Sequence, residues 1–221
     1  MRCLYCHNPD TWERMDGTPM TVEKLLAQYE GVRTFLRNGG ITATGGEPLL
    51  QIDFLTELFE KAKERGIHTC LDTSGVTFRP EDPDLLSKFD RLMAVTDLIM
   101  LDIKHIDDAA HRKLTGQPNH NILAFLDYLR ERDKDVWIRH VVVPGITLDR
   151  EALLRLGRHL GPYRNIRALD VIPYHTMGKV KYEKLGREYP LGDTPAATKE
   201  QALQARNLIL QGMRETRTPT P

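Results

Sequence analysis

The sequence is poor in cysteine, has no excess of charge of either sign and has no long apolar run. Its 221 residues include three cysteines, too few for the disulfide scaffold of a small secreted protein. The 31 basic and 31 acidic side chains cancel, so the composition gives no electrostatic footprint for nucleic acid or an anionic membrane. No run approaches the roughly 20 apolar residues that span a bilayer, and the first residues form no export signal. These absences predict a cytoplasmic globular enzyme with no nucleic-acid or membrane partner.

Apolar residues recur with helical spacing and with strand spacing in alternation along the chain. The predicted strands are 41–44, 67–72, 97–102, 136–143 and 168–173, and the predicted helices are 22–36, 54–66, 83–93, 121–132, 149–160 and 196–213. Five such units without a linker predict one α/β domain over residues 1–215, followed by a disordered tail, 216–221. The pattern leaves open a doubly wound sheet and a full or partial (β/α) barrel. Both folds place their chemistry at the carboxyl ends of the strands.

Polar residues and glycines gather at those predicted strand ends. They are Gly45, Gly46 and Glu47; Asp72 and Thr73; Asp102 and Lys104; and His175. A carboxylate that ends an apolar strand costs several kcal/mol to bury unless it is paired, and Lys104 is a candidate partner for Asp102. Arg139 interrupts an apolar strand, which indicates a charge that points into a ligand cavity. Three other histidines, His111, His120 and His159, are expected at the surface.

The segment Cys3-Leu4-Tyr5-Cys6-His7 fits three kinds of site. Read literally, it is a c-type haem attachment motif, although that chemistry needs export. A structural zinc site needs two more ligands with paired spacing, and Cys70 stands alone. An iron–sulfur cluster is also held by closely spaced thiolates. The segment Gly45-Gly46-Glu47-Pro48, taken alone, fits an ordinary strand-to-helix turn.

Together these motifs are more specific than each one is alone. The cysteine segment, read on to Asn8, and Gly45-Gly46-Glu47-Pro48 resemble the radical S-adenosylmethionine (SAM) enzymes. More closely, the chain is similar to the activases of glycyl radical enzymes, in segments that run from Met1 to about residue 213. The segments that carry this likeness are 1–8, 69–75, 101–104 and 173–175, followed by Gly178, Lys181 and Tyr182. The resemblance implies a partial (β/α)6 TIM-like barrel whose first strand is missing from this chain.

The resemblance also implies a reaction. A [4Fe–4S] cluster would reduce SAM, and the resulting 5′-deoxyadenosyl radical would take a hydrogen atom from a glycine of the partner protein. The implied partner is pyruvate formate-lyase, and the implied electron donor is reduced flavodoxin or ferredoxin. The activase itself would be monomeric.

The resemblance assigns roles residue by residue. Cys3 and Cys6 would ligate the cluster, with Lys104 beside them at the reacting centre. The residues that would bind SAM are Tyr5, Cys6, His7, Gly45, Gly46, Glu47, Asp102, Ile103, Lys104, Arg139 and His175. A monovalent cation would be held by Asp72, Thr73, the carbonyl of Met100 and Asp102.

One departure from the family pattern concerns the cluster. The family motif is C-x3-C-x2-C, and its first cysteine would fall two places before Met1. Cys70 matches a non-ligand cysteine of the family, so we expect Met1 to be an internal residue of a longer reading frame. The alternatives are an activase of another glycyl radical enzyme, a binding remnant without a cluster, and a zinc- or redox-active C-x-x-C protein.

Overall fold

The protein forms a sheet of five parallel strands. The structure, a computed structural model, describes residues 1–12, 17–37 and 39–217. The strands are β1 (Ile41–Ala43), β2 (Thr69–Thr73), β3 (Leu98–Asp102), β4 (Val136–Val142) and β5 (Ile166–Pro173). Each strand pairs in parallel with the next along the chain, in the order β1-β2-β3-β4-β5. All carboxyl ends therefore meet at one edge of the sheet.

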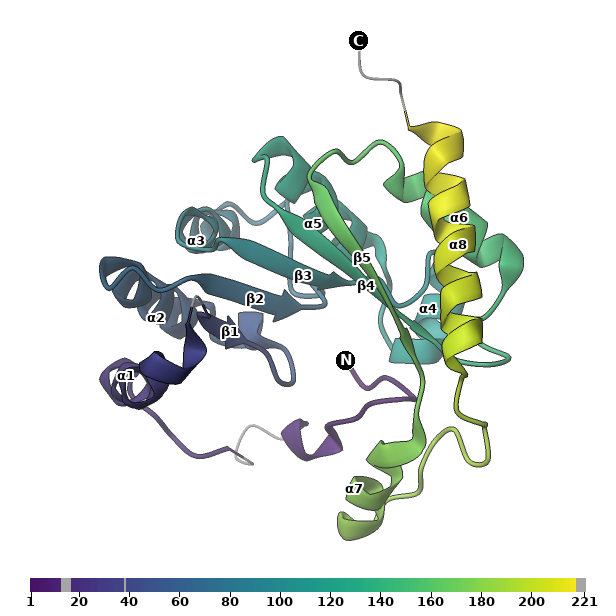
Figure 1. The fold of residues 1–221 in the computed structure, drawn as a ribbon, viewed down its shortest axis with the longest axis horizontal. Helices are drawn as coiled ribbons and strands as arrows, with labels where there is room; N and C mark the ends of the chain where they lie inside the picture. Colours follow the sequence, from purple (N-terminus) through teal and green to yellow (C-terminus); the bar gives the residue numbers. More distant parts are fainter. Residues whose placement is uncertain (13–16, 38, 218–221) are drawn as a thin grey trace.

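Helices connect the strands. They are α1 (Val22–Leu36), α2 (Ile52–Glu64), α3 (Pro83–Ala94), α4 (Asp108–Thr115), α5 (His120–Glu131), α6 (Arg150–Leu160), α7 (Lys179–Lys184) and α8 (Lys199–Thr216), with 3-10 turns η1 (Pro9–Thr11), η2 (Pro48–Gln51) and η3 (Thr176–Gly178). Figure 1 shows α1 and α2 toward the β1 end of the sheet and α6 and α8 toward the β5 end. Several helices begin at a residue whose side chain accepts a backbone amide hydrogen bond, which satisfies one free donor of the first turn. These caps are Thr21, Asp82, Asp107, Asp149 and Thr198.

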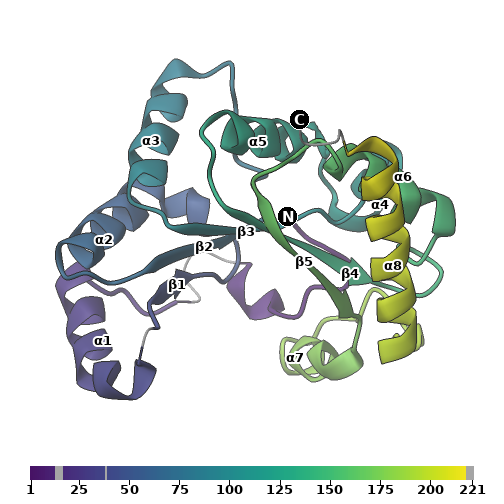
Figure 2. The same cartoon turned by 45° about the horizontal axis from the view of Figure 1, so that its top comes forward.

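The two faces of the sheet differ because successive side chains of a strand point to opposite sides. On β4, Val136, Ile138 and Val142 are fully buried under the helices. Trp137 and Arg139, which alternate with these residues, face the other way: Trp137 is 41% exposed and Arg139 is half-buried. Figures 1 and 2 show the N-terminal segment and α7 near one another at the end of the sheet where β4 and β5 finish. The face covered by helices holds the core. Side chains on the other face, near the carboxyl ends of the strands, line the cavity described below.

Helices α6 and α8 make the closest helix pair. A Cβ atom added to Gly157 would lie 2.1 Å from the carbonyl oxygen of Ile209, and one added to Gly212 would lie 2.3 Å from that of Leu154. The two backbones therefore touch because each helix presents a glycine to the other. This contact fixes the C-terminal helix beside the end of the sheet (Figure 2).

The α/β class predicted from the sequence is confirmed, and the five parallel strands are consistent with a partial TIM-like barrel. The predicted strands and helices are present with shifted ends, and α4 and α7 were not predicted. The predicted tail begins too early: Thr216 ends α8 and donates a hydrogen bond of 2.8 Å to the carbonyl oxygen of Arg158. Residues 218–221 of that tail lie outside the described part of the chain.

The prediction that His111 lies at the surface was wrong. His111 is buried, with Nδ1 2.6 Å from the carbonyl oxygen of Gln117. In the ranges that the structure describes, no helix has both the length and the apolar character needed to cross a bilayer.

Candidate active site

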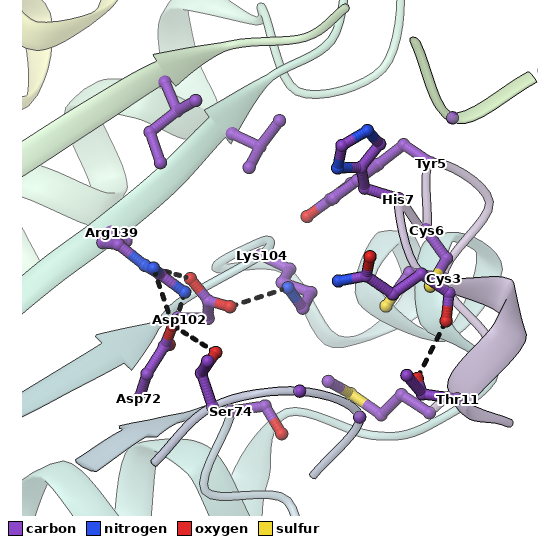
Figure 3. A pocket seen from close by; sticks show the side chains of 18 of the residues that line it. Cys3, Tyr5, Cys6, His7, Thr11, Asp72, Ser74, Asp102, Lys104 and Arg139 are labelled. Atoms are coloured by element: carbon purple, nitrogen blue, oxygen red, sulfur yellow. Dashed lines mark hydrogen bonds and ion pairs between the residues drawn. The ribbon is translucent and has the colours of Figure 1, made fainter. Parts of the chain in front are cut away.

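A cavity of about 360 Å³ opens at the carboxyl ends of the strands (Figure 3). Its walls come from the N-terminal segment, the loop after β1 and the ends of β2 to β5. Most of the residues predicted for the site line it: Cys3, Tyr5, Cys6, His7, Gly45, Gly46, Glu47, Asp72, Thr73, Asp102, Lys104, Arg139 and His175. Ile103 is buried behind the wall, and Met100 lies lower on β3, outside the lining. Six separate chain segments thus meet in one cavity.

The cysteine segment is held by backbone contacts to α4. The amides of Arg2 and Leu4 donate to the carbonyl oxygens of Thr115 and Leu114, at 3.1 and 2.9 Å. Because these carbonyls lie in the last turn of α4, their own helix leaves them without a partner. A short helix that the sequence analysis missed therefore anchors the N-terminal segment.

Cys3 and Cys6 lie on one tight turn, closed by a 3.0 Å bond from the Cys6 amide to the Cys3 carbonyl oxygen. Both thiols face the cavity (Figure 3). Burial raises the pKa of the Cys3 thiol, while the ammonium of Lys104 acts in the opposite direction. Burial also raises the pKa of Tyr182 to about 12, and the two thiols add to that effect from close by.

The third cysteine does not join this pair. Cys70 is buried on β2 and does not line the cavity. In the described residues no three histidine, cysteine or acidic side chains stand close enough together to hold a metal ion. The turn therefore presents two thiols, one fewer than the C-x3-C-x2-C pattern contains.

A chain of alternating charges forms the wall opposite the cysteines (Figure 3). Arg139 bridges two carboxylates, with Nη2 2.5 Å from Oδ1 of Asp72 and Nε 3.1 Å from Oδ1 of Asp102. Lys104 Nζ lies 3.0 Å from Oδ2 of Asp102, which confirms the candidate pairing. Thr44 donates to Asp72 at 2.8 Å. Parallel register explains the bridge, because Asp102 and Arg139 are directly paired on β3 and β4.

The two carboxyls of this chain respond differently to their surroundings. Burial raises the pKa of Asp72, because Arg139 and Thr44 only partly offset the desolvation. Burial acts the same way on Asp102, but Lys104 and Arg139 together hold its pKa below the ordinary value. Burial likewise opposes the charge on Lys104, and the nearby Asp102 holds the ammonium pKa well above its usual range. Asp102 is therefore the ionised centre between two cations.

Four protein donors hold the side chain of Glu47. Its carboxylate accepts hydrogen bonds from the hydroxyls of Thr73 and Ser74, both at 2.5 Å, and from the amides of Ser74 and Leu49, at 3.1 and 3.2 Å. The Thr73 hydroxyl in turn accepts from the Gly75 amide at 2.9 Å. Glu47 therefore ties the loop after β1 to the turn after β2.

Two histidines meet at another wall of the cavity. The rings of His7 and His175 are 4.9 Å apart and nearly perpendicular. Burial, with His175 and Lys181 in support, lowers the pKa of His7, which favours a neutral ring. Lys181 of α7 donates to Asn8 at 2.7 Å and so holds the segment that follows the cysteines.

Sequence reasoning missed several residues of the lining. Trp12 and Thr11 follow the cysteine turn, and Tyr174 and Tyr189 line the side near α7. Trp12 packs edge to face against Tyr182 at 5.8 Å. A signal for them in the sequence is the group of tyrosines around Lys181, which includes Tyr174, Tyr182 and Tyr189.

The parallel sheet and the cysteine turn at its carboxyl edge are typical of radical SAM enzymes, and comparison with known sequences agrees with that class. The chain belongs to the radical SAM superfamily, whose family description matches residues 1–157. Within it, the chain belongs to the family of pyruvate formate-lyase-activating enzymes. It is 45% identical to the pyruvate formate-lyase-activating enzyme of Streptococcus mutans, over 95% of this chain and 80% of that protein. It is 43% identical to that of Listeria monocytogenes, over 96% of this chain and 85% of the relative.

A solved structure agrees in fold. A domain of the pyruvate-formate lyase-activating enzyme from Bacteroides vulgatus matches with a TM-score of 0.63 at 24% identity, over 79% of this chain and 94% of that one. The protein is thus a radical SAM enzyme, and its family implies SAM and a [4Fe–4S] cluster. The cavity lining fits SAM in having glycines at one wall and charges of both signs at another. For the [4Fe–4S] cluster, the cavity offers two cysteine ligands, Cys3 and Cys6.

Proposed function

We propose that this enzyme activates pyruvate formate-lyase, creating a glycyl radical in it. The [4Fe–4S] cluster, when bound, supplies the electron that cleaves SAM reductively and so allows hydrogen abstraction from a glycine of the partner. The observation that supports this most directly is the convergence of the cysteine turn, the Gly45-Gly46 loop and the charged wall on one cavity of about 360 Å³. The relatives' name, pyruvate formate-lyase-activating enzyme, supplies the proposed partner.

The chain's own residues have distinct proposed tasks. Cys3 and Cys6 would hold two corners of the cluster. Gly46, which has no side chain, lets the SAM amino group approach the backbone. A Cβ atom at Gly46 would also crowd the Thr11 carbonyl oxygen, at 3.2 Å. Arg139, held between Asp72 and Asp102, presents a cation of fixed position to the carboxylate of SAM.

The remaining proposed contacts to SAM fall into two groups. Tyr5, Cys6 and His7 line its adenine side, and Asp102, Ile103, Lys104 and His175 complete the pocket. A monovalent cation beside the Asp72 and Asp102 carboxylates, with Thr73 and the Met100 carbonyl, is also proposed. The proposed electron donor is reduced flavodoxin or ferredoxin, and the proposed state is a monomer.

The test mixes the product of the complete reading frame, SAM, a reductant and pyruvate formate-lyase without oxygen. We expect a glycyl radical signal in electron paramagnetic resonance. Cys3→Ser and Cys6→Ser should abolish the signal, whereas Cys70→Ser, outside the cavity, should keep it. A protein with about four irons per chain that gives no signal with pyruvate formate-lyase would point to another glycyl radical enzyme as partner.

The two-thiolate turn favours one alternative, a binding protein without a cluster. Iron and sulfide counting after anaerobic reconstitution separates the two functions. About four irons per chain support the enzyme, and near zero supports the binding protein. Retained zinc, with no spectral change on adding dithionite, would instead indicate a zinc site.

A further inference from the structure

Glu47 stands in the glycine loop of the cavity, where a carboxylate suggests direct contact with the SAM ammonium. Its side chain instead makes four hydrogen bonds to protein donors. A carboxylate has about four lone-pair sites, so these bonds use the group's accepting capacity. Bonds to an ionised acceptor are also stronger than neutral ones.

The four donors lie on two different segments. Leu49 belongs to the start of η2, directly after the glycine loop, and Glu47 is the residue before that turn. Thr73 and Ser74 lie at the end of β2. Each carboxylate oxygen has a partner at the end of β2: Oε1 takes Thr73, and Oε2 takes the amide and hydroxyl of Ser74. These four hydrogen bonds, called the Glu47 clamp below, therefore fix the loop after β1 against the end of β2.

The glycine loop needs such support. Gly45 has a φ of +128°, a conformation that side-chain-bearing residues rarely adopt, and Gly46 packs against Thr11. The strand before the loop, β1, has only three residues and pairs with β2 alone among the described strands. Few ladder bonds hold the loop from its N-terminal side, so the clamp supplies the restraint on the other side.

We propose that Glu47 is a positioning residue that shapes the SAM site through Thr73 and Ser74 without touching SAM. This inference rests on the proposed function for the identity of the ligand. The clamp itself is a property of the free protein, so it can be tested separately.

The first measurement is amide hydrogen exchange in the ligand-free full chain. Glu47→Gln cannot accept from both oxygens, so we expect the Ser74 amide to exchange about tenfold faster. Glu57→Gln is the matched control, because Glu57 is exposed and contacts Lys61 on the surface of α2. Unchanged exchange at Ser74 in Glu47→Gln would overturn the clamp, whether or not the protein binds SAM.

The second measurement is a mutant cycle with S-adenosylhomocysteine as the probe. Glu47→Gln and the double variant Thr73→Val/Ser74→Ala should each weaken binding about tenfold, and the triple variant should lose little more than either. Losses that multiply to about a hundredfold in the triple variant would overturn the proposal, because they would mean that Glu47 contacts the ligand directly. Unaltered binding in Thr73→Val/Ser74→Ala would overturn it as well. If the wild-type protein does not bind the probe while Ser74 exchange still depends on Glu47, the proposed function fails and the clamp stands.

Discussion

The two faces of the sheet are built on opposite principles although they share the same strands. On β3, Leu101 points into the helix layer and is fully buried, whereas its neighbours Met100 and Asp102 face the other side and are half-buried. On β4, Ile138 and Arg139 divide in the same way. The stability of the helix face depends on the shape and volume of its side chains, and that of the site face depends on charge pairing. Asp102 and Arg139 each follow a buried apolar residue in the chain, Leu101 and Ile138, whose packing holds the strand in place.

The largest difference between the faces should appear within β3. Leu101→Ala should lower the free energy of unfolding by about 3 to 4 kcal/mol, because it leaves a cavity in a closed layer. Met100→Ala should cost only about 1 kcal/mol, because the half-buried side chain packs on one side only. Urea unfolding of both variants measures the two values. Equal losses would mean that the site face is packed as tightly as the core.

The second prediction concerns pH and uses His140, which neighbours Arg139 but faces the helices. Burial lowers the pKa of His140 to about 4, and its Nδ1 lies 2.8 Å from the Ile103 carbonyl oxygen. His105 and Lys104 add to the lowering, and Asp102 opposes it. The unfolded chain therefore binds the proton first, and stability falls as the pH drops from about 6.5 to about 4, by at most about 3 kcal/mol.

The matched test replaces one histidine at a time with asparagine. His140→Asn keeps a donor for the Ile103 carbonyl but does not titrate, so unfolding free energies measured across that window should vary less with pH. His120→Asn, on the exposed start of α5, should keep the wild-type slope. A slope that His140→Asn does not reduce would assign the acid sensitivity to His105 and His111, whose pKa values burial also lowers.

The third prediction addresses the site face, where charge rather than volume should decide stability. Arg139→Met keeps most of the side-chain volume but leaves Asp72 and Asp102 without their shared cation, at a cost of about 2 kcal/mol near pH 7. Adding Asp72→Asn should recover part of this loss, because a neutral amide is cheaper to bury than an unpaired carboxylate. Denaturant unfolding of the single and double variants measures the recovery. Arg158→Met, which breaks an exposed pair with Glu215, should cost much less than Arg139→Met, because solvent screens that pair.

The helix face of the sheet could be predicted from the sequence more completely than the site face. Runs such as 97–102 predict a buried parallel strand directly, and residues at the strand ends predict where chemistry lies. The Asp102–Lys104 pair was predictable because the two residues are close in sequence. The bridge from Arg139 to both carboxylates was not, because it depends on the register of three strands.

The short helices and buried histidines escaped prediction for a related reason. Helix α4 has eight residues, too few to show an apolar period, and its role depends on carbonyls that receive the amides of Arg2 and Leu4. His111 looked like a surface residue because its polar neighbours in sequence are exposed. Its burial comes from the packing of α4 and from Gln117, which folds back to meet its ring. Backbone contacts of this kind leave no pattern in the side chains.

The last prediction tests whether the helix layer is uniform, using the same substitution at two glycines. Gly157→Ala puts a methyl group against the Ile209 carbonyl oxygen, which must force α6 and α8 apart and cost about 1 to 2 kcal/mol. Gly31→Ala, inside α1, meets no atom within 4 Å, so the better helix propensity of alanine should stabilise by about 0.5 to 1 kcal/mol. Thermal unfolding of the two variants should therefore shift in opposite directions. A loss of stability in both would mean that α1 is packed as closely as the α6–α8 pair, and that the helix layer has no loose end beside β1.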